Sequence, residues 1–150
     1  MRDDMTPKPD LKDPSLYPHW CRETLRYCDT DAQGHINNVA FSVFCETGRT
    51  QFLLEPGRPL TPPGTFMVIA RLVLDFLGEI HWPGEVRIGT GVTRIGRTSF
   101  HLGQGVFVGE RCVAVADSVL VLADQETRRS TPLPDDLRSR LEKMMISVPA

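Results

Sequence analysis

The sequence predicts an α+β fold in which a curved antiparallel sheet wraps around one long central helix. The first observation is a single long helical segment early in the chain, at residues 37–54. The second is a change of the apolar pattern to a period of two from residue 65 onward, which is typical of strands. The third is that only short turns separate these later segments, and short turns join antiparallel neighbours. Together they favour α+β over a parallel βαβ arrangement.

The chain before the first strand predicts a flexible arm. Residues 1–18 hold four prolines and seven charged side chains, a composition that resists regular packing. Residues 19–150 then have the length of one domain with its own core. The first strand of that domain is predicted at Trp20–Tyr27, where the alternation is only partial.

The long helix is predicted from about Asn37 to Leu54, with Asn37 or Asn38 as its N-cap. It ends where the sequence Glu55-Pro56-Gly57 breaks the helical pattern. Its inward-facing candidates include Val39, Val43, Phe44 and Phe52.

The rest of the chain is predicted to form strands and one terminal helix. The strands cover residues 65–77, 85–95, 99–108 and 111–123, the last rich in Val, Leu and Ala and expected to be buried on both faces. A short amphipathic helix at 134–145 closes the chain. An open sheet of this kind leaves exposed edges, which pairing with a second copy removes. The sequence therefore predicts a homodimer or homotetramer.

Bulk composition excludes several classes of function. The 150 residues carry a net charge of −2 and no basic run interleaved with aromatics, so we expect no nucleic-acid partner. No apolar stretch is long enough for a membrane span, and the N-terminus has acidic residues and prolines where a signal peptide needs an apolar run. The four cysteines lack metal-type spacing and are expected to be reduced, which indicates a cytoplasmic protein.

The most informative segment is RYCDTDAQGHINNVAFSVFCETGR, residues 26–49, where a polar cluster leads directly into the long helix. The first helical N–H groups lack intrahelical partners and carry the positive end of the helix dipole. A carboxylate beside such donors suits acyl transfer, because it can attack or activate water while the amides hold an oxyanion. The polar side chains of the cluster are Asp29, Asp31, Gln33, His35, Asn37 and Asn38.

The string DTDAQGHINNVAF, the single long helix and the later IGRTSF segment resemble the hotdog-fold acyl-CoA thioesterases, in the branch of 4-hydroxybenzoyl-CoA thioesterase. The resemblance implies a site near a subunit interface with Asp31 as the catalytic carboxylate. It places the backbone N–H of Asn38 where the family polarises the thioester carbonyl. By a likeness to the acyl-carrier-protein thioesterases, Gln33 and His35 would assist Asp31. The implied substrate is an acyl-CoA thioester, with no further cofactor.

Two positions depart from the family pattern. Phe41 stands where the family usually has tyrosine, which removes a hydroxyl available for contact with substrate. Asn38 replaces a histidine common in one subgroup, so the role of that imidazole does not transfer. The GHINN version fits the long-chain acyl-CoA and acyl-carrier-protein subgroups better than the aromatic ones.

A second group of polar residues falls at the predicted hairpin between residues 95 and 99. It has two interpretations: a solvated turn, or a site for the phosphates of coenzyme A, for which arginine geometry is suited. The residues are Arg94, Arg97, Thr98 and Ser99.

Several polar residues also have structural interpretations. Asp31 beside Gly34 fits a turn as well as a catalytic role, and Asp29 is expected to fix the loop by bonding backbone N–H groups. Glu46 and Arg49 are spaced for an ion pair on the helix surface, although a glutamate on this helix is catalytic in another branch of the fold. The remaining histidines look isolated, and no metal site is predicted. These histidines are His19, His81 and His101.

Different functions on the same fold stay open. Hotdog hydratases and dehydratases use an Asp–His or Glu–His pair with four residues between the partners. Here Asp31 and His35 leave three between them, and Asp29 and His35 leave five, which argues against hydration. Two more functions fit the same sequence, namely an acyl-carrier-protein thioesterase and a non-catalytic acyl-binding protein.

Overall fold

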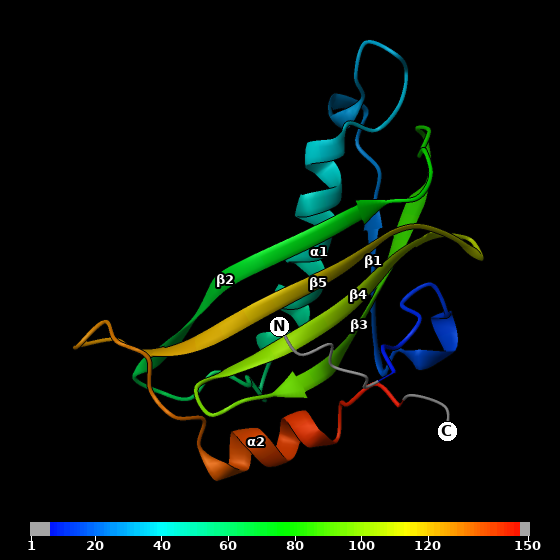
Figure 1. Ribbon diagram of the computed structural model, residues 1–150. Helices are drawn as coiled ribbons and strands as arrows, with labels where there is room; N and C mark the ends of the chain where they lie inside the picture. The colour runs from blue at the N-terminus through cyan, green and yellow to red at the C-terminus, as the bar shows by residue number, and fades with distance from the viewer. Residues whose placement is uncertain (1–6, 148–150) are drawn as a thin grey trace, which may run out of the picture.

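The computed structural model describes residues 7–147 and contains one five-stranded antiparallel sheet with the strand order β1-β3-β4-β5-β2. One long helix, α1, lies across one face of the sheet, and a short helix, α2, lies at one end of it (Figure 1). The predicted α+β fold, a curved sheet around one central helix, is confirmed. The elements are β1 His19–Thr24, α1 Asn38–Leu53, β2 Thr65–Phe76, β3 Glu85–Ile95, β4 Ser99–Val108, β5 Arg111–Asp124 and α2 Asp135–Glu142.

The helix α1 begins within one residue of its predicted start. Asn37 is its N-cap, since the Asn37 side chain accepts a hydrogen bond of 3.0 Å from the Ala40 N–H. The buried face of the helix includes Phe44 and Phe52, as predicted. Val39 and Val43 were expected inward as well, but they are 68% and 39% exposed.

The middle of α1 approaches the sheet very closely because Gly48 has no side chain. A Cβ atom at Gly48 would lie 2.6 Å from Ile88 Cγ2 and 2.7 Å from Gln104 Nε2. Beneath it, the buried Gln104 amide donates hydrogen bonds of 3.0 Å to the Cys45 carbonyl and 3.1 Å to Thr90 Oγ1. The helix backbone is thus bonded directly to side chains of the sheet.

The first strand is shorter than predicted. β1 ends at Thr24, and a 3₁₀ turn at Tyr27–Asp29 follows where the prediction continued the strand to Tyr27. The turn closes through a 3.0 Å hydrogen bond from the Asp29 N–H to the Arg26 carbonyl. The Arg26 guanidinium also donates to both Asp29 carboxylate oxygens, at 2.9 and 3.0 Å. These local bonds compete with strand pairing and end it.

The segment before β1 packs on the face of the sheet opposite α1, where the sequence predicts a flexible arm. Leu11 and Tyr17 are buried there with Phe107 and Ile146, and the Tyr17 hydroxyl donates to the Leu11 carbonyl. The strands beneath carry glycines at alternate positions, so the backbone lies open to these side chains. Those glycines are Gly89, Gly91, Gly103 and Gly105. The expectation of a flexible arm thus does not hold for residues 11–17, while residues 1–6 lie outside the described part.

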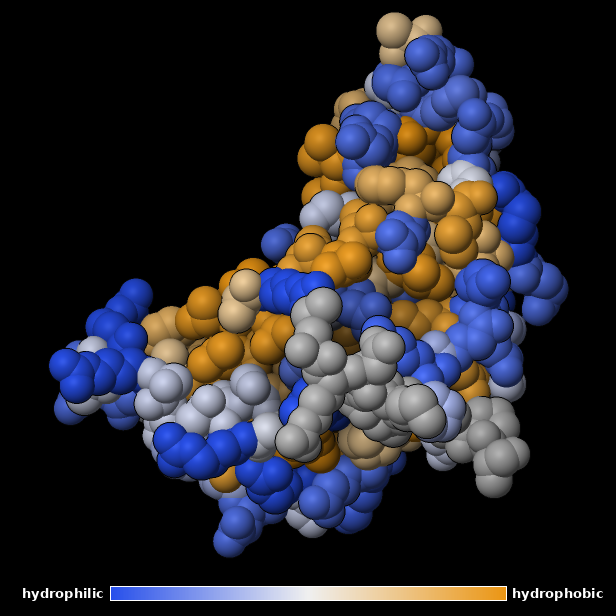
Figure 2. Space-filling model, viewed as in Figure 1, coloured by the Kyte–Doolittle hydropathy of each residue, from blue (hydrophilic) through white to orange (hydrophobic). Residues whose placement is uncertain are grey.

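Strand β2 forms an edge of the sheet and exposes apolar side chains. It pairs only with β5 among the described strands, and Val68, Ile69 and Phe76 are 41%, 43% and 51% exposed. Apolar surface gathers over β2 and the adjoining side of α1 in Figure 2. Val39 and Val43 on α1 are also exposed apolar residues. The apolar pattern assigned them to the core because it does not distinguish side chains that face the core from side chains in an exposed apolar surface.

The terminal helix α2 closes the other end of the core. Leu137 and Leu141 are buried against the second half of α1 and the strand ends, on the face predicted for this helix. The Arg138 guanidinium donates a 2.8 Å hydrogen bond to the Gly96 carbonyl at the β3–β4 hairpin. In the part of the chain that the structure describes, no helix is long and apolar enough to cross a bilayer.

Replacing Gly48 by alanine is expected to destabilise the fold, because the added methyl group overpacks the contact with Ile88 and Gln104 at a cost of about 1–3 kcal/mol. The gain in helix propensity, about 1 kcal/mol, offsets part of this cost and leaves a net loss of stability of up to about 2 kcal/mol. Urea titration of Gly48→Ala measures the net change. Thr50→Ala, on the exposed side of the same helix, is the control and should stay within about 0.5 kcal/mol of wild type. A Gly48→Ala protein at least as stable as wild type contradicts this account.

Candidate active site

The loop between β1 and α1 is tied to its surroundings by backbone hydrogen bonds. The Asp31 N–H donates to the His35 carbonyl at 2.8 Å, and the Asn37 N–H donates to the Asp29 carbonyl at 2.8 Å. The Ile36 N–H donates to the Ile80 carbonyl at 2.8 Å, which joins this loop to the segment between β2 and β3. Because Ile36 and Ile80 are both buried, the loop is anchored in the core although its polar side chains are exposed.

Asp29 has a structural position, although not by the predicted contacts. Its carboxylate forms the bidentate pair with Arg26 instead of bonding backbone N–H groups. Its carbonyl holds Asn37, the N-cap of α1. Asp29 therefore fixes the loop on both sides of Asp31.

Asp31 uses one carboxylate oxygen for the loop. Asp31 Oδ1 accepts hydrogen bonds from the Gln33 N–H at 2.9 Å and the His35 N–H at 3.1 Å. Within residues 7–147, Oδ2 has no hydrogen-bond partner, and the residue is exposed in the single chain. The structural and catalytic interpretations of Asp31 are thus compatible, since the turn fixes the carboxylate and leaves one oxygen free.

The start of α1 supplies donors that nothing else in the described chain uses. Asn37 caps the Ala40 N–H, whereas the N–H groups of Asn38 and Val39 have no partner among residues 7–147. Such amides carry the positive end of the helix dipole and favour negative charge. The same loop therefore presents an ionisable carboxylate and, a few residues later, the free amides of a helix start.

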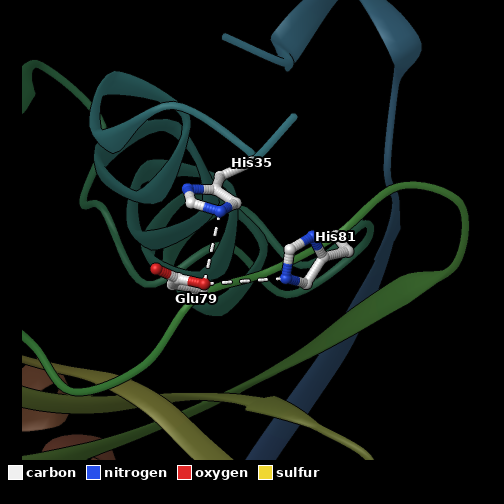
Figure 3. A group of neighbouring side chains, drawn as sticks. All are labelled: His35, Glu79 and His81. Carbon is white, nitrogen blue, oxygen red and sulfur yellow. Dashed lines mark ion pairs between the residues drawn. The ribbon is translucent and has the colours of Figure 1, made fainter. Parts of the chain in front are cut away.

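The two predicted helper residues lie on this loop in different settings. Gln33 is exposed, while His35 is partly buried, with its Nε2 3.3 Å from Glu79 Oε2. His81 Nε2 lies 3.6 Å from the same Glu79 oxygen, and the two imidazole rings are 4.9 Å apart at 82° (Figure 3). The prediction that His81 is isolated was wrong. The sequence Glu79–Ile80–His81, with one apolar residue between two polar ones, could have indicated that Glu79 and His81 lie on the same side of the chain. It does not indicate that they meet His35 in the loop before α1.

The hairpin residues Arg94, Arg97, Thr98 and Ser99 do not join the loop within one chain. They lie at the end of β3 beside α2, while the loop lies beyond the first residue of β3, which pairs with Thr24 (Figure 1). With a rise of about 3.3 Å per residue, the eleven-residue strand separates the two groups by roughly 30 Å. The hairpin backbone is fixed, since the Leu133 N–H donates to the Arg97 carbonyl at 2.9 Å, and both arginine side chains are exposed.

Two further side chains of α1 and β1 are unsuited to covalent catalysis. Burial raises the pKa of Cys45 to about 11 and the pKa of Cys21 to about 11, so both remain thiols at neutral pH.

The predicted Glu46–Arg49 ion pair was wrong: Arg49 turns inward, with Nη1 3.5 Å from Gln104 Oε1, and burial lowers its pKa. Glu46 stays exposed on the helix.

Two surface hollows of the single chain lie away from the Asp31 loop. One surface hollow lies beside Leu11 and Phe76, and another lies beside His19 and Leu54. Neither includes the loop. The Asp31 side chain is exposed in the single chain.

A curved sheet around one helix is the architecture of the hotdog thioesterases, and its loop before the helix carries the expected acidic sequence. The chain belongs to the thioesterase-like superfamily, whose family model matches residues 25–141. A predicted thioesterase from Bacillus stearothermophilus is 30% identical, with a TM-score of 0.77, and the match covers 87% of this chain and 98% of that one.

Two other proteins are similar to this chain. A thioesterase from Thermus thermophilus, solved with coenzyme A and zinc, is 28% identical, with a TM-score of 0.74 and coverage of 86% of this chain and 95% of that one. The protein YsmA of Bacillus subtilis is 26% identical over 121 residues, which cover 79% of this chain and 81% of YsmA. The predicted family and fold are confirmed, and thioester hydrolysis is the general activity they support.

Proposed function

We propose that the protein hydrolyses acyl-CoA thioesters to a carboxylic acid and free coenzyme A, with Asp31 as the catalytic carboxylate. The observation that carries this proposal is the joint presentation of Asp31 Oδ2 and the unpartnered Asn38 N–H by one loop of the described chain. In one route the carboxylate attacks the thioester carbon, the C–S bond breaks to release the coenzyme A thiolate, and water hydrolyses the resulting anhydride. In the other route the carboxylate takes a proton from a water molecule that attacks the carbon, and the same C–S bond breaks. The carbonyl oxygen becomes an oxyanion and accepts a hydrogen bond from the Asn38 N–H.

The energetics suit these groups. Thiolate leaves readily, and the main requirement is stabilisation of the oxyanion, to which one preorganised donor contributes about 3–4 kcal/mol. The free amide at the start of a sixteen-residue helix meets that requirement. His35 and Gln33 stand on the same loop to orient water or substrate.

A second copy of the chain completes the site in this proposal. The exposed edge strand β2 offers unpaired backbone groups together with apolar side chains, which favours edge-to-edge pairing. A two-fold axis at that edge reverses the strand direction, so the β3–β4 hairpin of one protomer lies at the same end of the dimer as the loop of its partner. The hairpin arginines can then reach a substrate that is bound at the partner's loop. A homotetramer built from such dimers keeps the same site.

The coenzyme is proposed to bind through its phosphates at that hairpin. Arg94 and Arg97 are exposed and have no carboxylate partner within 4.0 Å in the described chain, and Thr98 and Ser99 add hydroxyl groups. Guanidinium groups bind phosphate by paired hydrogen bonds. The Thermus thermophilus relative was solved with coenzyme A, which supports a ligand of this type.

Asp31→Asn is expected to lower kcat for acyl-CoA hydrolysis by at least about 100-fold, because it removes the charge of the attacking or activating group. The asparagine side chain retains the oxygen that accepts the Gln33 and His35 N–H groups, so the turn is preserved. Thiol release from short, long and aromatic acyl-CoAs, followed with a thiol reagent, measures the effect and identifies the favoured chain.

The matched control is Asp124→Asn. Asp124 Oδ1 accepts the Glu126 and Thr127 N–H groups at 2.9 Å each, in a turn of the same kind remote from the loop, and these bonds lower its pKa. This variant should retain wild-type activity.

Equal rates for Asp31→Asn and wild type remove Asp31 from the mechanism. Hydration of an enoyl-CoA without thiol release indicates a hydratase, and turnover only of acyl-carrier-protein substrates indicates the other thioesterase class.

Arg97→Ala is expected to raise KM for an acyl-CoA about tenfold, because a charged hydrogen bond to phosphate contributes about 1.5–3 kcal/mol in a desolvated site and less when exposed. The same variant should leave KM unchanged for the matching acyl-pantetheine, which lacks the nucleotide phosphates. Arg22→Ala, on the exposed part of β1, is the control. A KM increase for both substrates, or for neither, contradicts phosphate binding at the hairpin.

Ile69→Lys is expected to convert the oligomer to monomers, because symmetry places two buried lysines in each β2–β2 interface. Light scattering after size-exclusion chromatography measures the mass. Thr24→Lys adds the same charge to β1, the opposite edge of the sheet, and should leave the mass unchanged. An Ile69→Lys protein that keeps the wild-type oligomeric mass contradicts assembly through β2.

A further inference from the structure

Three side chains from two separate segments converge at the loop before α1. His35 Nε2 lies 3.3 Å and His81 Nε2 lies 3.6 Å from one oxygen, Oε2, of Glu79. One ligand atom from each residue can be chosen so that all lie within 4.8 Å of one another. In Figure 3 one oxygen of the Glu79 carboxylate faces a nitrogen of each imidazole ring.

The backbone holds these residues together. His35 and His81 form an antiparallel bridge, and the Ile36 N–H donates to the Ile80 carbonyl at 2.8 Å. Ile36 and Ile80 are 4% and 1% exposed. Since neighbouring side chains in an extended segment point to opposite sides, the residues that flank these isoleucines are directed away from the core. The fold therefore fixes the backbone positions from which the three side chains extend.

We propose that His35, Glu79 and His81 bind one divalent transition-metal ion of the zinc class, with a water molecule in the remaining position. Ligand distances of about 2.0–2.1 Å in a tetrahedral site place ligand atoms roughly 3.3–3.4 Å apart. The two nitrogen–oxygen distances of 3.3 and 3.6 Å are close to this spacing. The ligand atoms of the two imidazoles lie within 4.8 Å of each other, so the third distance reaches this spacing through rotation of the exposed Glu79 and His81 side chains.

Hydrogen bonding alone accounts less well for this arrangement. The 3.6 Å contact is longer than a hydrogen bond and the 3.3 Å contact exceeds the usual range. The two rings stand at 82° to each other, so their in-plane nitrogen lone pairs can meet at one point without ring overlap. A central ion gives both imidazoles and the carboxylate a common partner.

The donor set selects the type of ion. Two imidazoles with one carboxylate suit zinc, cobalt and nickel, whereas magnesium and calcium need more oxygen ligands than one glutamate supplies. Glu79 and His81 have side chains that are 64% and 62% exposed, which leaves access for the ion and room for water. A bound ion would link the Asp31 loop to the segment between β2 and β3, because Asp31 and His35 are joined by two hydrogen bonds that involve the His35 backbone.

Titration of the tag-free protein with Co²⁺ tests the site without any substrate. We expect one ion per chain, with the intense visible absorption of a four-coordinate cobalt centre, and a higher melting temperature when Zn²⁺ is added. His81→Ala and Glu79→Gln should each weaken cobalt binding by more than about tenfold and abolish the thermal shift. Both residues are exposed, so circular dichroism of these variants should match wild type.

Two controls complete the experiment. His101→Ala removes a histidine on β4 outside the cluster, and Cys28→Ser removes an exposed thiol that also binds such ions. Both variants should bind cobalt as wild type does. Absence of binding, binding that survives loss of His81 and Glu79, or binding lost in Cys28→Ser overturns the proposal. None of these results depends on thioester hydrolysis, so the metal site and the proposed function fail separately.

Discussion

The close contact between α1 and the sheet at Gly48 is the constraint on which the rest of the structure depends. A helix that crosses a sheet normally stands off by the length of its side chains, but here Ile88 and Gln104 reach the position of a missing Cβ. The Gln104 amide also bonds to the Cys45 carbonyl inside the helix. Because the contact joins a rigid helix to rigid strands, it fixes the height and the rotation of α1 over the sheet.

That position determines what the start of the helix can do. Once α1 is fixed at its centre, its first residues lie at one end of the sheet, where Ile36 bonds to Ile80 and Asn37 bonds to Asp29. The chain entering the helix must turn there, and Asp31 makes the turn with a single carboxylate oxygen. Within the described chain, the Asn38 amide and the second Asp31 oxygen stay free for the same reason: the turn and the cap are completed by other atoms.

The sequence predicts the local elements well and the long-range contacts poorly. Strands over residues 85–108 could be predicted because period-two alternation and turn residues act over a few positions. The Asp31 loop could be located because a dense cluster of polar residues directly precedes the long helix in the sequence. The inward turn of Arg49 and the approach of His81 to His35 depend on partners 55 and 46 residues away along the chain. The packing of Leu11 and Tyr17 depends on glycines in other strands, so composition alone wrongly indicated a flexible segment.

Two apolar side chains are exposed in the single chain, and the proposed dimer explains both exposures. Val39 is 68% exposed at the start of α1, and Ile69 is 43% exposed on the edge strand. Asp31 is exposed as well, at the entrance to the same helix. An aqueous carboxylate is a poor nucleophile and water screens an oxyanion, so the catalysis proposed for this loop requires surface that excludes solvent. In the proposed dimer, the apolar side of α1 and β2 supplies that surface because a second chain covers it. In the proposed dimer, the partner that buries Val39 and Ile69 also encloses the Asp31 loop.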